Sequence, residues 1–390
     1  MVSAQDARIK DLVGEATTAL RAGNAPAALK LMRQAEAAAP DDVGVKMQLA
    51  LALRTSGDLQ GALGALDAAL AIDPYLLLAL LSKGWILEKL ARPREAAAIY
   101  RHALKIVPSG DALPPNLQGP VAQARQAVAR DTDAMAEHLL KSTAAIRARH
   151  AGEKLDRFDE SLEVFAGRKK VYVHEPILLN FPHLPAIQFY DRELFPWLGE
   201  LEAATDAIRE ELAVVMREDL EAFDPYIQYP PGVPVNQWVE LNHSPRWNSY
   251  FLWRDGQRVE EHCARCPNTA RALAGLPMLS QPGFGPSAMF SVLSPRTHIP
   301  PHTGSANTRL VTHLPLILPG DCWFRVGNDT RDWKMGEAWV FDDTIEHEAM
   351  NDSDHTRVVL IFDVWNPMLS AAERELVGAM MAAKNEYLAG

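Results

Sequence analysis

The chain of 390 residues has few features that would place it outside a cell or in a membrane. It has three cysteines, too few for a disulfide framework, which agrees with a reducing compartment. Its first residues lack the basic region and apolar core of a secretory signal. Its longest apolar run, residues 75–81, is far shorter than the ~20 residues that a spanning helix needs. These absences predict a cytoplasmic protein without a membrane span.

Basic charge is also scarce, because 39 Lys and Arg residues against 50 Asp and Glu residues give a net charge of −11 at pH 7. Surfaces that bind nucleic acids are normally basic, so this balance argues against a nucleic acid as the main partner. The sequence also lacks a glycine-rich phosphate-binding loop and a nucleophilic serine elbow. The usual motifs for phosphoryl transfer and for serine hydrolysis are therefore absent from the sequence.

Alanine and leucine at helical spacing are abundant in the first third of the chain. Small residues let two helices of a hairpin approach closely, and a proline stops the second helix. Such residues recur here every 34 positions: Pro40, Pro74 and Pro108; Ala28, Ala62 and Ala96; Ala35, Ala69 and Ala103; and Ala16, Ala50 and Gly84. The pattern resembles tetratricopeptide repeats, in three copies over residues 9–110. A stack of this kind needs a cap, which residues 118–150 can supply as a helix.

Two functions are open for these repeats: a concave surface for a peptide or protein partner, or a platform for folding and dimerisation. Near residue 150 alanine becomes rarer while proline, tryptophan, phenylalanine and histidine become more frequent, which predicts two domains, 1–150 and 151–390. In the second domain we expect helices at 198–219 and 368–388, an early strand at 186–191, and strands at 237–241, 247–254, 287–294, 309–318, 322–327, 337–342 and 357–364.

Many short strands separated by turns indicate a double-sheet jelly roll or a barrel. The predicted fold class is therefore a multidomain α+β protein. An all-α tetratricopeptide solenoid comes first, and a double-stranded β-helix of the jelly-roll or cupin-like type follows it.

His302 follows a Pro-Pro turn at a strand entry, and His347 follows the turn 342–344, 45 residues later and with strands between. At this spacing a jelly roll can bring two strand ends together. Neutral imidazoles suit iron, and iron oxygenases often use two histidines and one carboxylate. The acid would be expected two residues after the first histidine, but Gly304 has no ligand atom. The residues alone leave open an iron site and a pair of structural histidines near turns.

Two arginines begin otherwise apolar strands. Arg309 shares one strand face with His313, and Arg357 shares another with Asp363, because side chains alternate along a strand. A buried arginine is costly unless an anion pairs with it, and a planar guanidinium binds a carboxylate in bidentate fashion. Arg357 is therefore a candidate for the distal carboxylate of 2-oxoglutarate, with hydrogen bonds from His313 and Ser291. The alternative is an internal salt bridge between Arg357 and Asp363.

Together these motifs resemble the aspartyl/asparaginyl β-hydroxylase family, over roughly residues 180–368. That family consists of iron(II)- and 2-oxoglutarate-dependent dioxygenases, and its animal members carry a tetratricopeptide-like region before the catalytic domain. The resemblance implies an oxidoreductase that uses Fe(II), 2-oxoglutarate and O2 to hydroxylate the β-carbon of aspartyl or asparaginyl residues in a peptide or protein. It is carried by Pro301–Gly304, Arg309, His313, Phe341–Glu348, Arg357 and Asp363–Trp365.

The resemblance also implies roles for individual residues. His302 and His347 would be the only protein ligands of iron, with water in the place that Gly304 leaves open. Arg309 would face the substrate carboxylate. Val311 departs from a basic residue common in the animal enzymes, which puts peptide specificity in doubt. Four residues would hold 2-oxoglutarate: Ser291, His313, Arg357 and, as a neighbouring aromatic ring, Trp253.

Other interpretations stay open. The same chemistry could act on a small molecule, such as an amino acid derivative or a lipid, or the chain could be a non-catalytic adaptor with a relic jelly roll. The repeats favour a polypeptide substrate, and the joint presence of the candidate site residues argues against a relic. Cys263 and Cys266 form a lone C-x-x-C pair without the second pair that a structural zinc needs. They are either chance loop cysteines or zinc ligands, and the oligomeric state is open.

Overall fold

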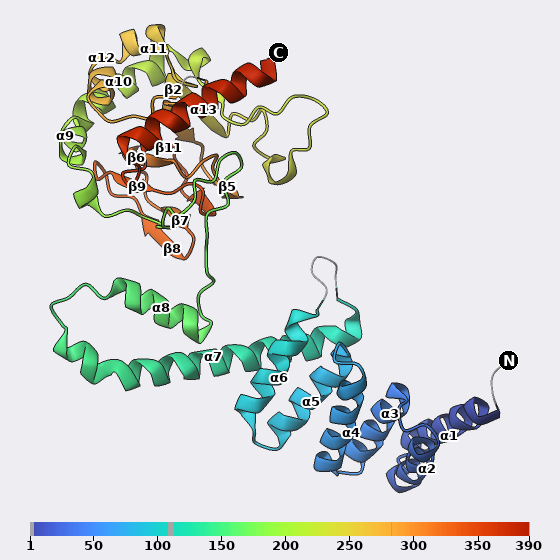
Figure 1. Cartoon of the computed structure of the whole chain (residues 1–390). Coiled ribbons are helices and arrows are strands. Elements are labelled where there is room, and N and C mark those ends of the chain that lie inside the picture. Colours follow the sequence, from blue (N-terminus) through green and yellow to red (C-terminus); the bar gives the residue numbers. More distant parts are fainter. Residues whose placement is uncertain (1–3, 108–112, 282, 390) are drawn as a thin grey trace. The chain divides into compact units, whose positions relative to one another are not determined.

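A computed structural model describes residues 4–107, 113–281 and 283–389, and the chain divides into two compact units (Figure 1). Residues 1–169 form the helical unit and residues 170–390 form the sheet unit. This division lies later than the composition change at residue 150. The reason is α8 (Asp156–Ala166), which packs through Leu162 and Ala166 on Ala136 of the preceding helix and so belongs to the helical unit.

The helical unit contains three helix hairpins at the predicted 34-residue spacing. Asn24, Asp42 and Asp58 cap the starts of three of the helices with side-chain oxygens that accept a backbone N–H, which satisfies an otherwise unpaired donor. The predicted cap is one long helix, and Pro108 lies outside the described residues. The helices are α1 (Ala4–Arg21), α2 (Ala25–Ala38), α3 (Val43–Thr55), α4 (Leu59–Ile72), α5 (Leu77–Lys89), α6 (Pro93–Lys105) and α7 (Pro115–Arg149).

The small residues of the repeat pattern lie where the helices of each hairpin meet, and all of them are buried. The third repeat shows why one of these positions is a glycine. A Cβ at Gly84 would lie 2.3 Å from the Tyr100 ring, which is buried at the place that Leu66 occupies one repeat earlier. The larger ring is accommodated because Gly84 replaces the Ala50 of the preceding repeat. The tetratricopeptide arrangement predicted from the sequence is therefore confirmed by the packing.

The sheet unit contains two antiparallel sheets. The larger has the order β1-β2-β4-β11-β6-β9 with β3 beside β2, and the smaller has the order β5-β10-β7-β8. The larger sheet consists of β1 (Asp224–Pro225), β2 (Trp247–Arg254), β3 (Gln257–Arg258), β4 (Ala288–Leu293), β6 (Arg309–Ile317), β9 (Trp339–Phe341) and β11 (Arg357–Trp365). The smaller consists of β5 (Thr297–His302), β7 (Cys322–Val326), β8 (Asp329–Asp332) and β10 (His347–Asn351).

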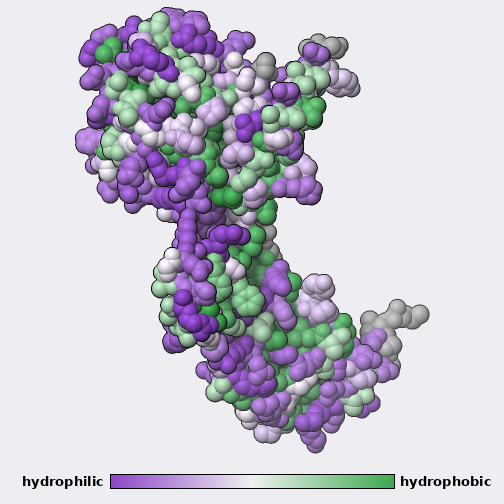
Figure 2. All heavy atoms as spheres, turned by 60° about the vertical axis from the view of Figure 1, so that its left-hand side comes forward, coloured by the Kyte–Doolittle hydropathy of each residue, from purple (hydrophilic) through white to green (hydrophobic). Residues whose placement is uncertain are grey.

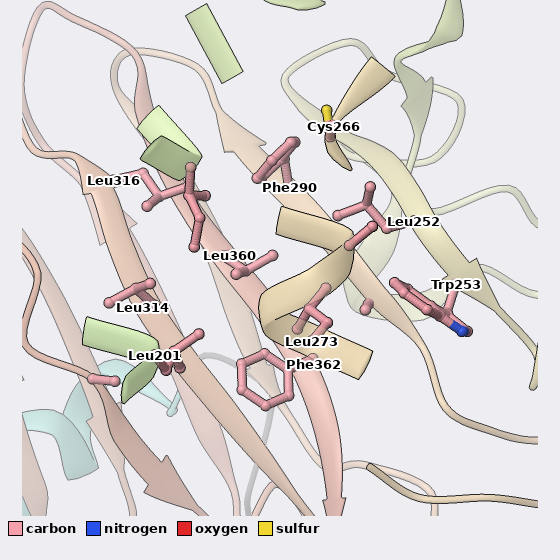
Figure 3. Packing of buried hydrophobic residues seen from close by; sticks show 14 of the residues in the cluster. Leu201, Leu252, Trp253, Cys266, Leu273, Phe290, Leu314, Leu316, Leu360 and Phe362 are labelled. Carbon is pink, nitrogen blue, oxygen red and sulfur yellow. The ribbon is translucent and has the colours of Figure 1, made fainter. Parts of the chain in front are cut away.

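The larger sheet separates two hydrophobic cores. One face packs on four helices, α9 (Leu198–Ala203), α10 (Thr205–Glu218), α11 (Glu260–Arg265) and α12 (Pro267–Ala274), as the buried cluster in Figure 3 shows. The other face packs on the smaller sheet. Because side chains alternate, Val358 and Leu360 of β11 point to the helices, whereas Arg357 and Ile361 line a cavity on the other side. The candidate site lies on this second side.

The remaining helices are short or peripheral. They are the 3-10 turns η1 (Arg192–Leu194), η2 (Leu220–Ala222) and η3 (Asn236–Trp238), and the final helix α13 (Ala371–Ala389). Hydrophilic residues cover much of the face of the sheet unit seen in Figure 2, with smaller hydrophobic areas between them. No helix within the described residues combines the length and apolar character needed to cross a membrane.

Several local predictions were wrong. The strand predicted at 237–241 is η3 followed by turns, and Asn236 has a φ of 43° that a strand does not allow. The segment 186–191 forms only an isolated bridge from Phe189 to Phe341. The helix predicted at 198–219 breaks at Ala204 into α9 and α10. β5 and β10 were not predicted, because their prolines and polar residues interrupt the alternation of apolar and polar residues that is typical of a strand.

Candidate active site

The two predicted histidines lie side by side at the edge of the smaller sheet. His302 is the last residue of β5 and His347 is the first residue of β10, and the two are direct partners in the antiparallel pair. Their ring centroids are 4.1 Å apart. The expectation that two strand ends meet is confirmed, although the strands themselves were not predicted. The pairing gives the histidines a fixed relative position before any ligand binds.

Both rings are oriented by their own backbone. The Nδ1 atom of His302 lies 2.8 Å from the Pro300 carbonyl, and that of His347 lies 3.0 Å from the Ile345 carbonyl. Because a carbonyl only accepts, each ring donates from Nδ1 and keeps a free lone pair on Nε2. Burial lowers the pKa of His347 to about 4 and holds that of His302 well below its ordinary value, helped by the neighbouring His347 ring. Both rings are therefore neutral at pH 7, as metal ligands must be.

The place where a third ligand was expected is taken by an acid from elsewhere in the chain. A Cβ at Gly304 would lie 1.9 Å from Oδ2 of Asp343, so no other residue fits there without moving this carboxylate. The Gly304 N–H also donates to the Asp343 carbonyl at 2.6 Å. Asp343 lines the cavity, and its buried Oδ1 has no hydrogen-bond partner among the described residues. Sequence reasoning missed Asp343, although it lies only four residues before His347.

Arg309 is held by two carboxylates instead of standing free for a substrate. Its guanidinium donates to Asp343 Oδ2 at 2.8 Å and to Asp363 Oδ1, and Asp363 Oδ2 accepts the backbone N–H of Ser287 at 2.9 Å. Burial raises the pKa of both acids, and Arg309 opposes that rise. Burial lowers the pKa of Arg309, but the two acids more than reverse this effect. Arg309, which we predicted to face a substrate carboxylate, is therefore already paired with two acids of the chain.

Arg357 has the opposite surroundings. Its side chain is 1% exposed, and its Nε and Nη1 atoms have no hydrogen-bond partner in the part of the chain that the structure describes. The guanidinium carbon lies 4.7 Å from the centre of the Trp333 ring. Burial lowers the pKa of Arg357 to about 10. The alternative of an internal salt bridge to Asp363 is wrong, since Asp363 pairs with Arg309.

The other two predicted polar residues lie near Arg357 on neighbouring strands. Ser291 of β4 and His313 of β6 are both buried and both line the cavity. The Trp247 indole donates to the Ser291 hydroxyl at 3.0 Å. Nδ1 of His313 has no partner among the described residues, and burial, with Arg357 nearby, holds the pKa of His313 well below its ordinary value. The structure therefore brings Arg357, His313 and Ser291 into one pocket.

Trp253 does not belong to this group. It belongs to the core on the helix side of the larger sheet, near Leu252, and does not line the cavity (Figure 3). The cause is a bulge in β2 between Phe251 and Trp253, which shifts the side-chain alternation by one residue. Trp247 and Trp238 supply aromatic walls instead, and the Trp238 ring lies 4.9 Å from that of His302.

These residues enclose a cavity of about 390 Å³, a volume typical of small-molecule sites. Its inner end lies around Arg357. Its outer end lies around Asp363, about 20 Å farther along β11 at ~3.3 Å per residue, and includes the exposed Ile177 and Tyr226. His302 and His347 line the same cavity. The arrangement provides one end for a small anion and another for a second molecule.

The C-x-x-C pair takes no part in this site. Cys263 of α11 and Cys266, between α11 and α12, are buried free thiols, and burial raises the pKa of both. Within residues 4–107, 113–281 and 283–389, no group of three or more His, Cys, Asp and Glu side chains suits a metal ion. The pair therefore has no additional ligands in the described structure.

The family model that matches this chain lies within the sheet unit. Residues 202–367 match the family model described as Aspartyl/Asparaginyl beta-hydroxylase. The ornithine lipid ester-linked acyl 2-hydroxylase of Rhizobium tropici is 36% identical over 202 residues, which are 51% of this chain and 67% of that protein. Human aspartyl/asparaginyl beta-hydroxylase is 34% identical over 150 residues, 38% of this chain and 20% of its own length. The chain thus spans two thirds of one relative and one fifth of the other.

A solved structure resembles part of the chain more weakly. The O-GlcNAc transferase of Thermobaculum terrenum is 26% identical, over 28% of this chain and 21% of that chain, with a TM-score of 0.26. This score is too low to support a structural conclusion. The repeat assignment follows from the three hairpins and their buried small residues.

Proposed function

This chain belongs to the aspartyl/asparaginyl β-hydroxylase family, and we propose that it is an iron(II)- and 2-oxoglutarate-dependent hydroxylase. The observation that carries the proposal is the unpaired guanidinium of Arg357, buried at the inner end of the cavity that holds His302 and His347. A buried cation without an internal acid is costly unless a ligand anion completes it. The distal carboxylate of 2-oxoglutarate has the charge and planar geometry for that role.

The two histidines fit iron(II) by their chemistry. They are neutral, they share one cavity wall, and their backbone hydrogen bonds leave each Nε2 free to bind a metal. When bound, iron with 2-oxoglutarate and oxygen would supply an oxidant able to replace an unactivated C–H bond by C–OH. The protein's task is then to hold these groups and to exclude competing reactions.

Asp343 provides the acid that Gly304 lacks. We assign it a supporting role beside the iron rather than a place among the metal ligands, because Arg309 already pairs with one of its oxygens. The free Oδ1 would accept a hydrogen bond from water held next to the metal. Gly304 is required by this arrangement, since any side chain at that position would displace the Asp343 carboxylate.

His313 and Ser291 complete the proposed 2-oxoglutarate site. Both lie on the face of the larger sheet that carries Arg357, and His313 has an unused ring nitrogen. We also propose that the two sheets, which share one core, form a double-stranded β-helix.

The three free, buried cysteines are consistent with the expected cytoplasmic location.

Two substrate classes are candidates at the outer end. The name of the human relative points to aspartyl or asparaginyl residues, and three helix hairpins of the tetratricopeptide type suit a polypeptide partner. The name of the rhizobial relative points to an ester-linked acyl chain. The outer end supports the acyl candidate, because Arg309 is already paired with two acids and Val311 is apolar. Ile177, Phe284 and other apolar side chains complete this wall.

An anaerobic titration tests the proposal. Adding iron(II) and 2-oxoglutarate to the wild-type protein should produce the weak visible absorption band of the bound pair, and His302→Ala should abolish it. Admitting oxygen should then yield succinate, with faster turnover in the presence of the correct substrate. Peptides rich in Asp and Asn and an ester-linked acyl lipid should be compared by mass increase. A wild-type protein that gives neither band nor succinate would refute the enzyme and favour the adaptor.

A further inference from the structure

Residues 174–181 form a segment, here called the strap, that crosses the loops carrying both histidines. In Figure 1 it lies in the green connection between α8 and α9. The strap belongs to the sheet unit and follows the helical unit within a few residues. Its backbone amides donate to carbonyls in both loops: Glu175 to Thr344 (2.8 Å), Ile177 to Gly304 (3.0 Å), and Leu178 and Leu179 to Ser305 (2.9 and 3.0 Å).

One buried side chain connects the strap to the loop after His302. Asn307 is 1% exposed, and its Oδ1 accepts the backbone N–H of Phe181 at 2.7 Å. Its Nδ2, which carries two hydrogens, lies 2.8 Å from His174 Nδ1, 2.9 Å from the Phe181 carbonyl and 3.0 Å from Asn180 Oδ1. Every partner of this amide group lies in the strap. An aspartate could not replace it, because a second oxygen would face three acceptors.

The strap also forms part of the cavity. Ile177 lines the outer end although it is 77% exposed, so its position depends on the backbone bonds of the strap rather than on burial. Just before the strap, the Tyr172 hydroxyl contacts Arg325 at 3.3 Å, and Arg325 pairs with Glu346 and Glu348 on either side of His347. The segment from Tyr172 to Phe181 is therefore connected to the surroundings of both histidines.

We infer that Asn307 is a positioning residue, which holds the strap against the loop after His302 and thereby fixes both Gly304 and the outer wall at Ile177. The inference rests on the proposed function only where it concerns the metal. The contacts between the strap and the loop do not depend on the proposed function. Losing Asn307 would leave several buried partners unsatisfied at one point, which favours local opening of the strap over global unfolding.

The test uses Asn307→Ala in the full chain, with Asn351→Ala as a matched control. Asn351 is an equally buried asparagine whose Nδ2 also donates to three acceptors, the carbonyls of Leu293, Ser294 and His355. Hydrogen exchange of the metal-free protein should accelerate at least tenfold at the amides of Ile177, Leu178 and Leu179 in Asn307→Ala alone. Cobalt(II), used as a spectroscopic probe, should bind about tenfold more weakly to the same variant.

Two results would overturn the inference: unchanged strap exchange in Asn307→Ala, or equal acceleration in the Asn351→Ala control. Faster exchange with unchanged cobalt affinity would also overturn it, since the strap would then be structural only. If wild type binds no cobalt, the proposed function fails, while the exchange data still decide whether Asn307 holds the strap. If Asn307→Ala does not fold, the exposed Asn180→Ala should accelerate strap exchange two- to threefold, and no acceleration would count against the inference.

Discussion

Arg309 and Arg357 make an instructive pair, because both begin a strand of the larger sheet and line one cavity, the first largely buried and the second fully buried. Arg309 is paired with Asp343 and Asp363, whereas none of the ion pairs among the described residues involves Arg357. Burial lowers the pKa of Arg357 to about 10, while the two acids keep that of Arg309 above its ordinary value. Arg309 therefore forms ion pairs within the protein at the outer end, whereas Arg357 is available to bind a ligand anion at the inner end.

This difference shows where a ligand is expected. A charge that the protein satisfies itself contributes to the fold, and removing it leaves its partners unpaired. A charge that the protein leaves unsatisfied weakens the free fold and is recovered only when an anion binds. Sequence alone cannot separate the two cases, because the acid that shares a strand face with Arg357, Asp363, pairs with Arg309 instead.

The largest effect is expected at the outer end. Arg309→Met should lower the free energy of unfolding by about 3–5 kcal/mol, because the buried carboxylates of Asp343 and Asp363 lose their cation. Urea unfolding at pH 7 measures this. Asp343→Asn combined with Asp363→Asn should recover part of the loss in the Arg309→Met background. A loss below ~1 kcal/mol would show that the paired state of Arg309 is not what the contacts indicate.

The next effect should have opposite signs for binding and stability. Arg357→Met should weaken 2-oxoglutarate binding at least 100-fold, or ~3 kcal/mol, because the ligand carboxylate loses its partner. The same variant should be no less stable than wild type without ligand, since a buried uncompensated charge is gone. Calorimetric titration with manganese(II) in place of iron, together with urea unfolding, measures both. Destabilisation as large as that of Arg309→Met would contradict the comparison.

The sequence predicted the inner end well, because alternation is regular along β11 and along β6 from Arg309 to Pro315, which fixes which residues share a face. It failed where the backbone departs from regularity. The bulge in β2 turns Trp253 away from the cavity, and no residue pattern signals it. Asp343 was missed because its carboxylate occupies the place that a side chain at Gly304 would take. The two residues lie on different loops, and their spacing along the chain does not reveal this contact. The strap was missed because its bonds are made by backbone amides, which every sequence has.

Asp342 extends the comparison to acids, since it lies next to the paired Asp343 but lacks an arginine. It is fully buried, its Oδ2 has no hydrogen-bond partner among the described residues, and the Nε2 atom of His174, whose pKa burial lowers, lies 3.6 Å from it. Burial raises the pKa of Asp342 to about 7. The folded protein therefore binds this proton more tightly than the unfolded chain, so the stabilising contribution is complete below about pH 4 and is lost as pH rises through 7.

Asp342→Asn should remove this loss. Its free energy of unfolding should exceed that of wild type by an amount that grows by about 2 kcal/mol between pH 5 and pH 8. The buried histidines His302, His313 and His347 have lowered pKa values and give the opposite trend, a gain in stability as pH rises, which for His347 runs from about 4 toward the ordinary pKa of histidine. That trend is the same in wild type and in Asp342→Asn, so it cancels when the two free energies of unfolding are subtracted. Parallel stability curves would show that Asp342 is ionised in the fold throughout this range.

The smallest effect concerns the aromatic ring that takes the place of an acid beside Arg357. The guanidinium lies over Trp333, and an indole attracts a cation more strongly than a benzene ring does. Trp333→Phe should therefore weaken 2-oxoglutarate binding only about twofold, near ~0.5 kcal/mol, while Arg309 and its two acids are unaffected. The Trp339→Phe control alters a ring that stacks on Trp333 but has no cation over it in the described part of the chain. Equal weakening in both variants would assign the effect to packing, and a 100-fold loss in Trp333→Phe would mean that the ring, not Arg357, holds the anion.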